Sequence, residues 1–169
     1  MNIQETYNYL VRARRDLWTA LESISDEVLS RQLLNGDRFH CIKDLVLHIP
    51  DVEDGWIHQD ILRDEPVQKS IPSLTQDGPA CTHIALEAQL NYWRLVEQST
   101  LQYLATLTEA DSKRVVILHD SPEERFTVDG LLWHVMIHEM RHTAQIAVLL
   151  RTQDIKPPSL DLLFYLPSA

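Results

Sequence analysis

The stretch LLWHVMIHEMRHTAQIAVL, residues 131–149, combines helical periodicity with three histidines. Its inward positions advance by three or four residues at a time, which is the spacing of one face of an α-helix. That face is formed by Leu131, Val135, His138, His142, Gln145 and Leu149. Because such a stripe packs against neighbouring helices, this segment is predicted to be a core helix of an all-α protein.

Within this stretch, residues 138–142 read HEMRH, the His-Glu-x-x-His pattern of many zinc peptidases. A peptidase of that type usually takes a third metal ligand from further along the chain. After His142 the only carboxylates are Asp154 and Asp161, and no sheet is evident to hold a peptide. We therefore interpret HEMRH as a metal-binding pair rather than a peptidase motif. Glu139 is a candidate catalytic base, but we interpret it first as a residue of the helix surface.

A third histidine, His48, follows the same rhythm on a second predicted helix, residues 41–63. Imidazole rings inside a bundle are costly unless they have partners, and one ion bound by His48, His138 and His142 would satisfy all three. The alternative is a set of hydrogen-bonded core histidines. Neutral imidazoles suit a divalent transition metal ion: zinc or nickel, with iron and manganese as further candidates beside cobalt and copper.

The remaining histidines are weaker candidates. His134, one turn before His138, is a candidate for the rim of the site or for catalysis, and the others are expected on the surface or in loops: His40, His58, His83 and His119. Asp44 and Gln145 each lie one turn from a proposed ligand and are candidates to orient it. Cys41 is expected to be a buried, unreactive thiol.

The other periodic segments complete a bundle. Helices are predicted at residues 3–24, 25–32, 41–63, 80–107 and 127–151, the third of them bent at Pro50, with a long loop over residues 64–79. RVVIL, residues 114–118, is a candidate extended piece, and SLDLLFYL, residues 159–166, a short terminal helix. We predict an up-down four-helix bundle with a short C-terminal helix, forming one domain over residues 1–169.

Composition limits the class of function. The formal net charge of −10 argues against a nucleic-acid partner bound through a basic surface. No apolar run reaches the roughly 18 residues that a membrane span needs, and the N-terminus lacks the core of an export signal. With only two cysteines, a cytoplasmic protein with reduced thiols is expected.

The chain resembles the DinB/YfiT-like family of metal-binding four-helix proteins. The resemblance rests on SISDEVL after the first helix, on the histidine in DLVLHIPDVEDGWI, on residues 131–149 and on the tail KPPSLDLLFYL. It implies that His48, His138 and His142 are the metal ligands. Two departures are Thr143-Ala144-Gln145 in place of the usual Arg-Gly-Gln, and Pro50 two residues after His48.

The resemblance implies a metal-dependent transferase that activates a low-molecular-weight thiol for attack on a small electrophile. The alternatives are a metal-dependent hydrolase that uses metal-bound hydroxide and a non-catalytic metal-binding stress-response protein. A small-molecule substrate and a homodimer are expected, with no nucleic-acid or membrane partner. The four tryptophans are expected to pack in the core, or else to line a pocket: Trp18, Trp56, Trp93 and Trp133.

Overall fold

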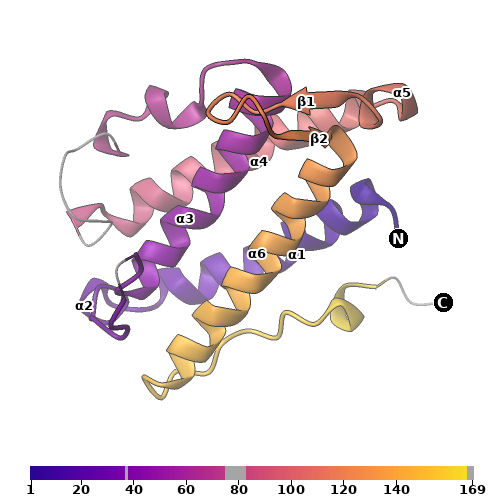
Figure 1. The fold of residues 1–169 in the computed structure, drawn as a ribbon. Coiled ribbons are helices and arrows are strands. Elements are labelled where there is room, and N and C mark those ends of the chain that lie inside the picture. The colour runs from indigo at the N-terminus through magenta and orange to yellow at the C-terminus, as the bar shows by residue number, and fades with distance from the viewer. Residues whose placement is uncertain (37, 75–82, 167–169) are drawn as a thin grey trace.

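The structure is a computed structural model that describes residues 1–36, 38–74 and 83–166. Four long helices form a bundle: α1 (Ile3–Glu22), α3 (Ile42–Asp54), α4 (Leu86–Thr106) and α6 (Val128–Arg151) (Figure 1). Both α1 and α3 pack against α4 and α6, so α1 and α3 lie diagonally across the bundle. The all-α, four-helix fold expected from the sequence is confirmed.

Short elements connect these helices. They are α2 (Asp26–Leu29), the π-helix η1 (Gly55–Leu62), the 3₁₀ turns η2 (Val67–Ser70) and η3 (Pro72–Leu74), α5 (Glu109–Ser112), the strands β1 (Val115–Ile117) and β2 (Arg125–Thr127), and the 3₁₀ turn η5 (Leu162–Tyr165). The strands pair antiparallel with Val116 opposite Phe126. The extended piece predicted in RVVIL is therefore confirmed, whereas its partner strand was not predicted.

Several element boundaries differ from the sequence prediction. The second long helix is α-helical only to Asp54 and continues as η1, with Pro50 accommodated inside α3. Helix α4 begins at Leu86 rather than near residue 80, although residues 80–82 lie outside the described part. The short helix predicted over residues 25–32 covers only Asp26–Leu29. The terminal helix predicted over residues 159–166 is only the 3₁₀ turn Leu162–Tyr165.

The connection after α3 refines the topology. The chain runs from η1 back along η2 and η3 towards the end of the bundle at which α3 begins (Figure 1). Consequently α3 and α4 run in the same general direction, and residues 63–74 lie beside both helices. The prediction of a long loop over residues 64–79 is confirmed as far as residue 74, with two 3₁₀ turns inside it.

The core is apolar at both ends of the bundle. Around Trp18 and Trp93, whose rings meet edge to face at 5.6 Å, aliphatic side chains from α1, α3 and α6 are almost fully buried. Burying each large apolar side chain contributes about 1.5–3 kcal/mol. Trp18 and Trp93 are core residues as expected, while Trp56 and Trp133 are partly buried. Among the helices of the described residues, none has the length and apolar character needed to cross a membrane.

Candidate metal centre

The proposed ligands lie together where α3 packs against α6. His48 comes from α3, and His138 and His142 come from successive turns of α6. Each offers a ring nitrogen, and these three nitrogens lie within 4.8 Å of one another. The centroids of the His138 and His142 rings are 4.3 Å apart. The structure therefore brings together the three histidines that the sequence pattern selected.

The nitrogens suit a shared ion. The Nε2 atoms of His48 and His138 are 3.0 Å apart. Ligands at about 2.0–2.1 Å from one metal ion are separated by about 3.0–3.4 Å, so this pair fits a common ion. Burial, together with the smaller effect of neighbouring cationic groups, lowers the pKa of His48 to about 4 and that of His138 to about 3. Both imidazoles are therefore neutral at pH 7, which is the protonation state that binds metal.

Neighbouring side chains hold the rings in place. Nδ1 of His142 lies 2.6 Å from Oε1 of Gln145, so Nδ1 carries the proton and Nε2 is left for a metal. The Phe39 ring packs against His48 at 4.8 Å and against His142 at 5.7 Å. Asp44 has a capping role, because its Oδ2 accepts the backbone N–H of His40 and Cys41 at the start of α3.

The other candidates fall in different places. His134 is exposed, and its ring meets the Trp56 ring edge to face at 5.4 Å. Its position is that of a rim residue, since its nitrogens are not in the three-histidine cluster. Cys41 is fully buried, and burial raises the pKa of its thiol to about 11, which agrees with an unreactive cysteine.

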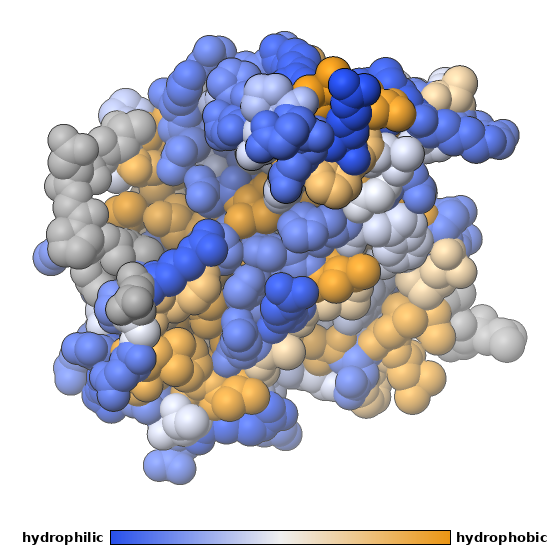
Figure 2. Space-filling view, viewed as in Figure 1, coloured by the Kyte–Doolittle hydropathy of each residue, from blue (hydrophilic) through white to orange (hydrophobic). Residues whose placement is uncertain are grey.

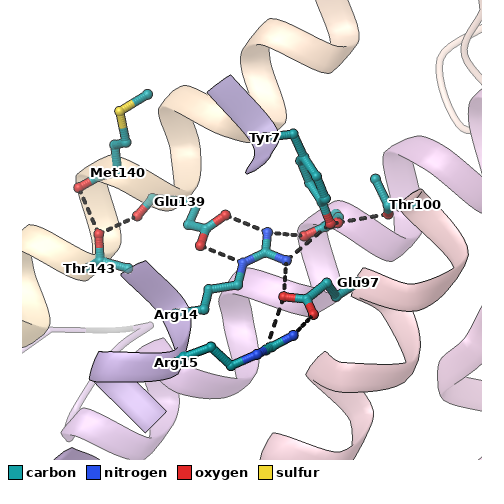
Figure 3. Close-up of polar contacts among 9 residues, drawn as sticks. Tyr7, Arg14, Arg15, Glu97, Thr100, Glu139, Met140 and Thr143 are labelled. Atoms are coloured by element: carbon teal, nitrogen blue, oxygen red, sulfur yellow. Dashed lines mark hydrogen bonds and ion pairs between the residues drawn. The ribbon is translucent and has the colours of Figure 1, made fainter. Parts of the chain in front are cut away.

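Glu139 is not the surface residue expected from the sequence. It is only 2% exposed, and both of its carboxylate oxygens accept hydrogen bonds from the guanidinium of Arg14 on α1, at 2.7 and 2.6 Å (Figure 3). The prediction failed because a helix face next to the histidine stripe also packs inward, where α6 meets α1. Burial raises the pKa of Glu139, while the charge of Arg14 opposes that rise.

Arg14 is the centre of a larger buried network. Besides Glu139 it donates to Glu53 at 3.0 Å, to Glu97 at 3.2 Å and to the Tyr7 hydroxyl at 3.0 Å (Figure 3). All four long helices thus contribute a charged group to one cluster. In the sequence, the only sign of this cluster was the interruption of the first apolar stripe by Arg14 between Leu10 and Leu17.

A second buried polar cluster was also missed. His58, expected on the surface, is 5% exposed, because η1 turns it towards α4. Its Nε2 lies 2.5 Å from Oγ of Ser99. Its Nδ1 lies 2.7 Å from Oδ1 of Asp54, but this contact does not have the geometry of a hydrogen bond. Ser99 lies in the middle of α4, where the backbone N–H groups are used within the helix, so the backbone beside Ser99 offers no free donor for an oxyanion.

The comparisons with known proteins agree with this fold. The sequence profile of the DinB family matches residues 1–169. The chain belongs to the DinB family. No protein of curated function matches it.

Three solved structures share the fold of this DinB protein. A DinB-like protein from Bacillus cereus has 17% identity and a TM-score of 0.64, over 93% of this chain and 94% of that one. The DinB-like protein YjoA from Bacillus subtilis has 17% identity and a TM-score of 0.59, over 93% and 97%. YfiT from Bacillus subtilis, described as a probable metal-dependent hydrolase with an unusual four-helix bundle topology, has 19% identity and a TM-score of 0.63, over 91% and 89%.

Proposed function

We propose that this DinB protein is a metal-dependent transferase that activates a low-molecular-weight thiol for attack on a small electrophile. His48, His138 and His142 would hold one divalent transition metal ion, with zinc and nickel as the leading candidates. When bound, such an ion stabilises a coordinated thiol as its thiolate at neutral pH. The sulfur then bonds to the electrophilic carbon, the leaving group departs with its electron pair, and the proton of the thiol passes to solvent.

The observation that carries this proposal is the position of Glu139. Both of its oxygens are bound to Arg14, so the glutamate of the HEMRH motif is directed into the bundle and away from the role of general base. What remains at the cluster is a set of neutral nitrogen donors. That set suits a reaction whose nucleophile, a thiol, is activated by the metal alone.

A metal-dependent hydrolase is the second candidate. It is favoured by the description of YfiT, which shares the fold, as a probable metal-dependent hydrolase. Metal-bound water could be the nucleophile at the same three histidines, but protonation of the leaving group would have to come from a residue other than Glu139.

The first test is elemental analysis of untagged protein purified without chelator, beside His138→Ala. We expect about one transition-metal ion per chain in the wild type and loss of that ion in the variant. The loaded protein is then assayed with an aryl halide and a thiol, and with a nitrophenyl ester without thiol. Thiol-dependent product supports the transferase, ester cleavage alone supports the hydrolase, and a loaded protein inactive in both contradicts a catalytic role.

A further inference from the structure

Two arginines, Arg38 and Arg141, lie close enough to the three-histidine cluster for their charges to act on its rings. Both are exposed, and neither guanidinium forms an ion pair with any residue that the structure describes. Among the described residues, Arg14, Arg15 and Arg94 are each paired with a glutamate, whereas the exposed Arg12, Arg125 and Arg151 resemble Arg38 and Arg141 in forming no ion pair. What distinguishes Arg38 and Arg141 is their place: in a chain with a formal net charge of −10, two cations without an ion pair to any described residue lie beside the same three histidines.

The position of Arg38 follows from its ring contacts. Its guanidinium carbon lies 5.3 Å from the centroid of the Phe39 ring, and that same ring packs on His48 and His142. The charge of Arg38 is close enough to lower the pKa of His48, where it is the largest influence after burial.

Arg141 approaches the site from the other helix. It directly precedes His142 on α6 and lies three residues after His138, so it flanks both ligands on the outer side of the helix. Its charge also lowers the pKa of His142, after the effects of burial and of Gln145. On the face that carries α3 and α6 in front, hydrophilic side chains gather between the middle of these two helices (Figure 2).

We propose that the ligand of this site carries a carboxylate or a comparable anionic group besides the atom that meets the metal, and that Arg38 and Arg141 bind this anion. The inference rests on the proposed function and adds the chemical class of the thiol. Guanidinium groups suit this task because their N–H donors match the oxygens of a carboxylate in pairs. Asp51 lies one turn after His48 on α3, and the charge of Arg38 lowers the pKa of this carboxyl against the larger effect of burial, although the two side chains form no ion pair.

The test is a binding titration of cobalt-loaded protein, read from the sulfur-to-cobalt absorption band. Mercaptoacetate, which has a carboxylate, is compared with 2-mercaptoethanol, which is neutral. We expect tighter binding of mercaptoacetate to the wild type. Each of Arg38→Gln and Arg141→Gln should weaken it by about tenfold, the effect of one charge-assisted hydrogen bond, while binding of 2-mercaptoethanol changes by less than about twofold.

Matched variants make the result specific. Arg151→Gln removes an exposed arginine at the end of α6 and should leave both affinities unchanged. Asp51→Asn removes a negative charge near Arg38 and should tighten mercaptoacetate binding only. Equal affinities of the wild type for both thiols, or equal weakening of both in the arginine variants, would overturn the assignment.

The two proposals can fail separately. If neither thiol gives the absorption band, the thiol chemistry is wrong. The arginine assignment is then decided by glycolate, the hydroxyl analogue of mercaptoacetate, read from the visible bands of cobalt. Weaker glycolate binding in the Arg38→Gln, Arg141→Gln double variant supports the anion site, and unchanged binding overturns it.

Discussion

At the scale of single residues, the buried pair of Arg14 and Glu139 lies on the face of α6 next to the candidate metal ligands. Glu139 lies between two proposed ligands in the sequence, yet its carboxylate is directed towards α1, where it binds Arg14. The pair fixes the rotation of α6 about its axis, because turning the helix would separate two charges that are 1% and 2% exposed. His138 and His142 are thereby directed towards His48. Arg14 and Glu139 therefore help to set the positions of the candidate ligands on α6.

Replacing Arg14 by methionine tests the importance of this network for stability. Arg14→Met would leave Glu53 and Glu139 buried without their cationic partner. Breaking a buried ion pair from one side costs about 3–5 kcal/mol, and we expect a loss of this size in the free energy of unfolding, measured by urea titration. Arg15→Met is the control, because the Arg15 side chain is 50% exposed and its loss should cost less than about 1 kcal/mol. Equal losses in both variants would contradict a special role for Arg14.

The lowered pKa values of the histidines predict how stability depends on pH. His48 has a pKa of about 4 in the folded protein, below the ordinary value of 6.5 that it regains on unfolding. Between these pH values the unfolded chain binds more protons than the folded protein. The contribution of His48 to the free energy of unfolding is therefore complete above about pH 6.5 and is lost as the pH falls through about 4.

Chelator-treated protein should show this effect in urea unfolding. Between pH 7.5 and pH 4.5, we expect the free energy of unfolding to fall by about 2 kcal/mol more in the wild type than in His48→Gln. This value follows because each unit of pKa shift corresponds to about 1.4 kcal/mol. His83→Gln, which changes an exposed histidine, should behave as the wild type. The same pH slope in wild type and His48→Gln would show that His48 is not held neutral by the fold.

At the scale of elements, the sequence predicts periodic segments well and buried polar contacts poorly. Helix α6 is capped by Thr127, whose hydroxyl accepts the N–H of Gly130, and the predicted span of residues 127–151 is confirmed to within a residue. The three histidines fall on helical stripes, so their meeting could be predicted from spacing alone. The continuation of α3 as a π-helix could not, since it alters the direction of side chains such as His58 without changing the apolar pattern.

Buried charges were missed for a related reason. Glu53, Glu97 and Asp54 are acidic residues of a kind that usually lies on the exposed face of a helix. They are buried here because they have partners from distant segments. Asp54 accepts the backbone N–H groups of Val67 and Gln68 as well as the hydroxyl of Tyr92. Such contacts between residues far apart in the chain leave no periodic signal in a single sequence.

Asp54→Asn tests whether this carboxylate anchors the connection after α3. An amide has one acceptor oxygen in place of two, so at least one of the N–H groups of Val67 and Gln68 would lose its partner. Loss of such a bond costs about 1–3 kcal/mol, and we expect amide exchange at η2 to quicken by about tenfold or more in hydrogen-exchange mass spectrometry. Asp60→Asn is the control, because Asp60 accepts the N–H of the exposed residue His119 instead. Unchanged exchange at η2 in Asp54→Asn would contradict the anchoring role.

At the scale of the whole molecule, the candidate metal centre joins two helices that are separated by a long stretch of chain. His48 lies on α3 and the other two ligands lie on α6, and these helices pack directly on each other. An ion bound there would link them in the folded state, whereas the unfolded chain would hold His48 far from His138 and His142. Metal binding should therefore stabilise the fold as a whole, in addition to any chemical role.

Thermal unfolding with and without metal tests this link. A ligand present at 100 times its dissociation constant stabilises the folded state by about 2.7 kcal/mol, and about 2–4 °C of melting temperature corresponds to each kcal/mol in a chain of this size. We therefore expect calorimetry to show a rise of about 5–10 °C when zinc or nickel is added to chelator-treated wild type. The rise should be absent in His48→Ala, which removes the only ligand on α3, and should persist in His134→Ala, which changes the exposed histidine at the rim. An equal rise in wild type and His48→Ala would place the bound metal elsewhere and remove the basis for a site that joins α3 to α6.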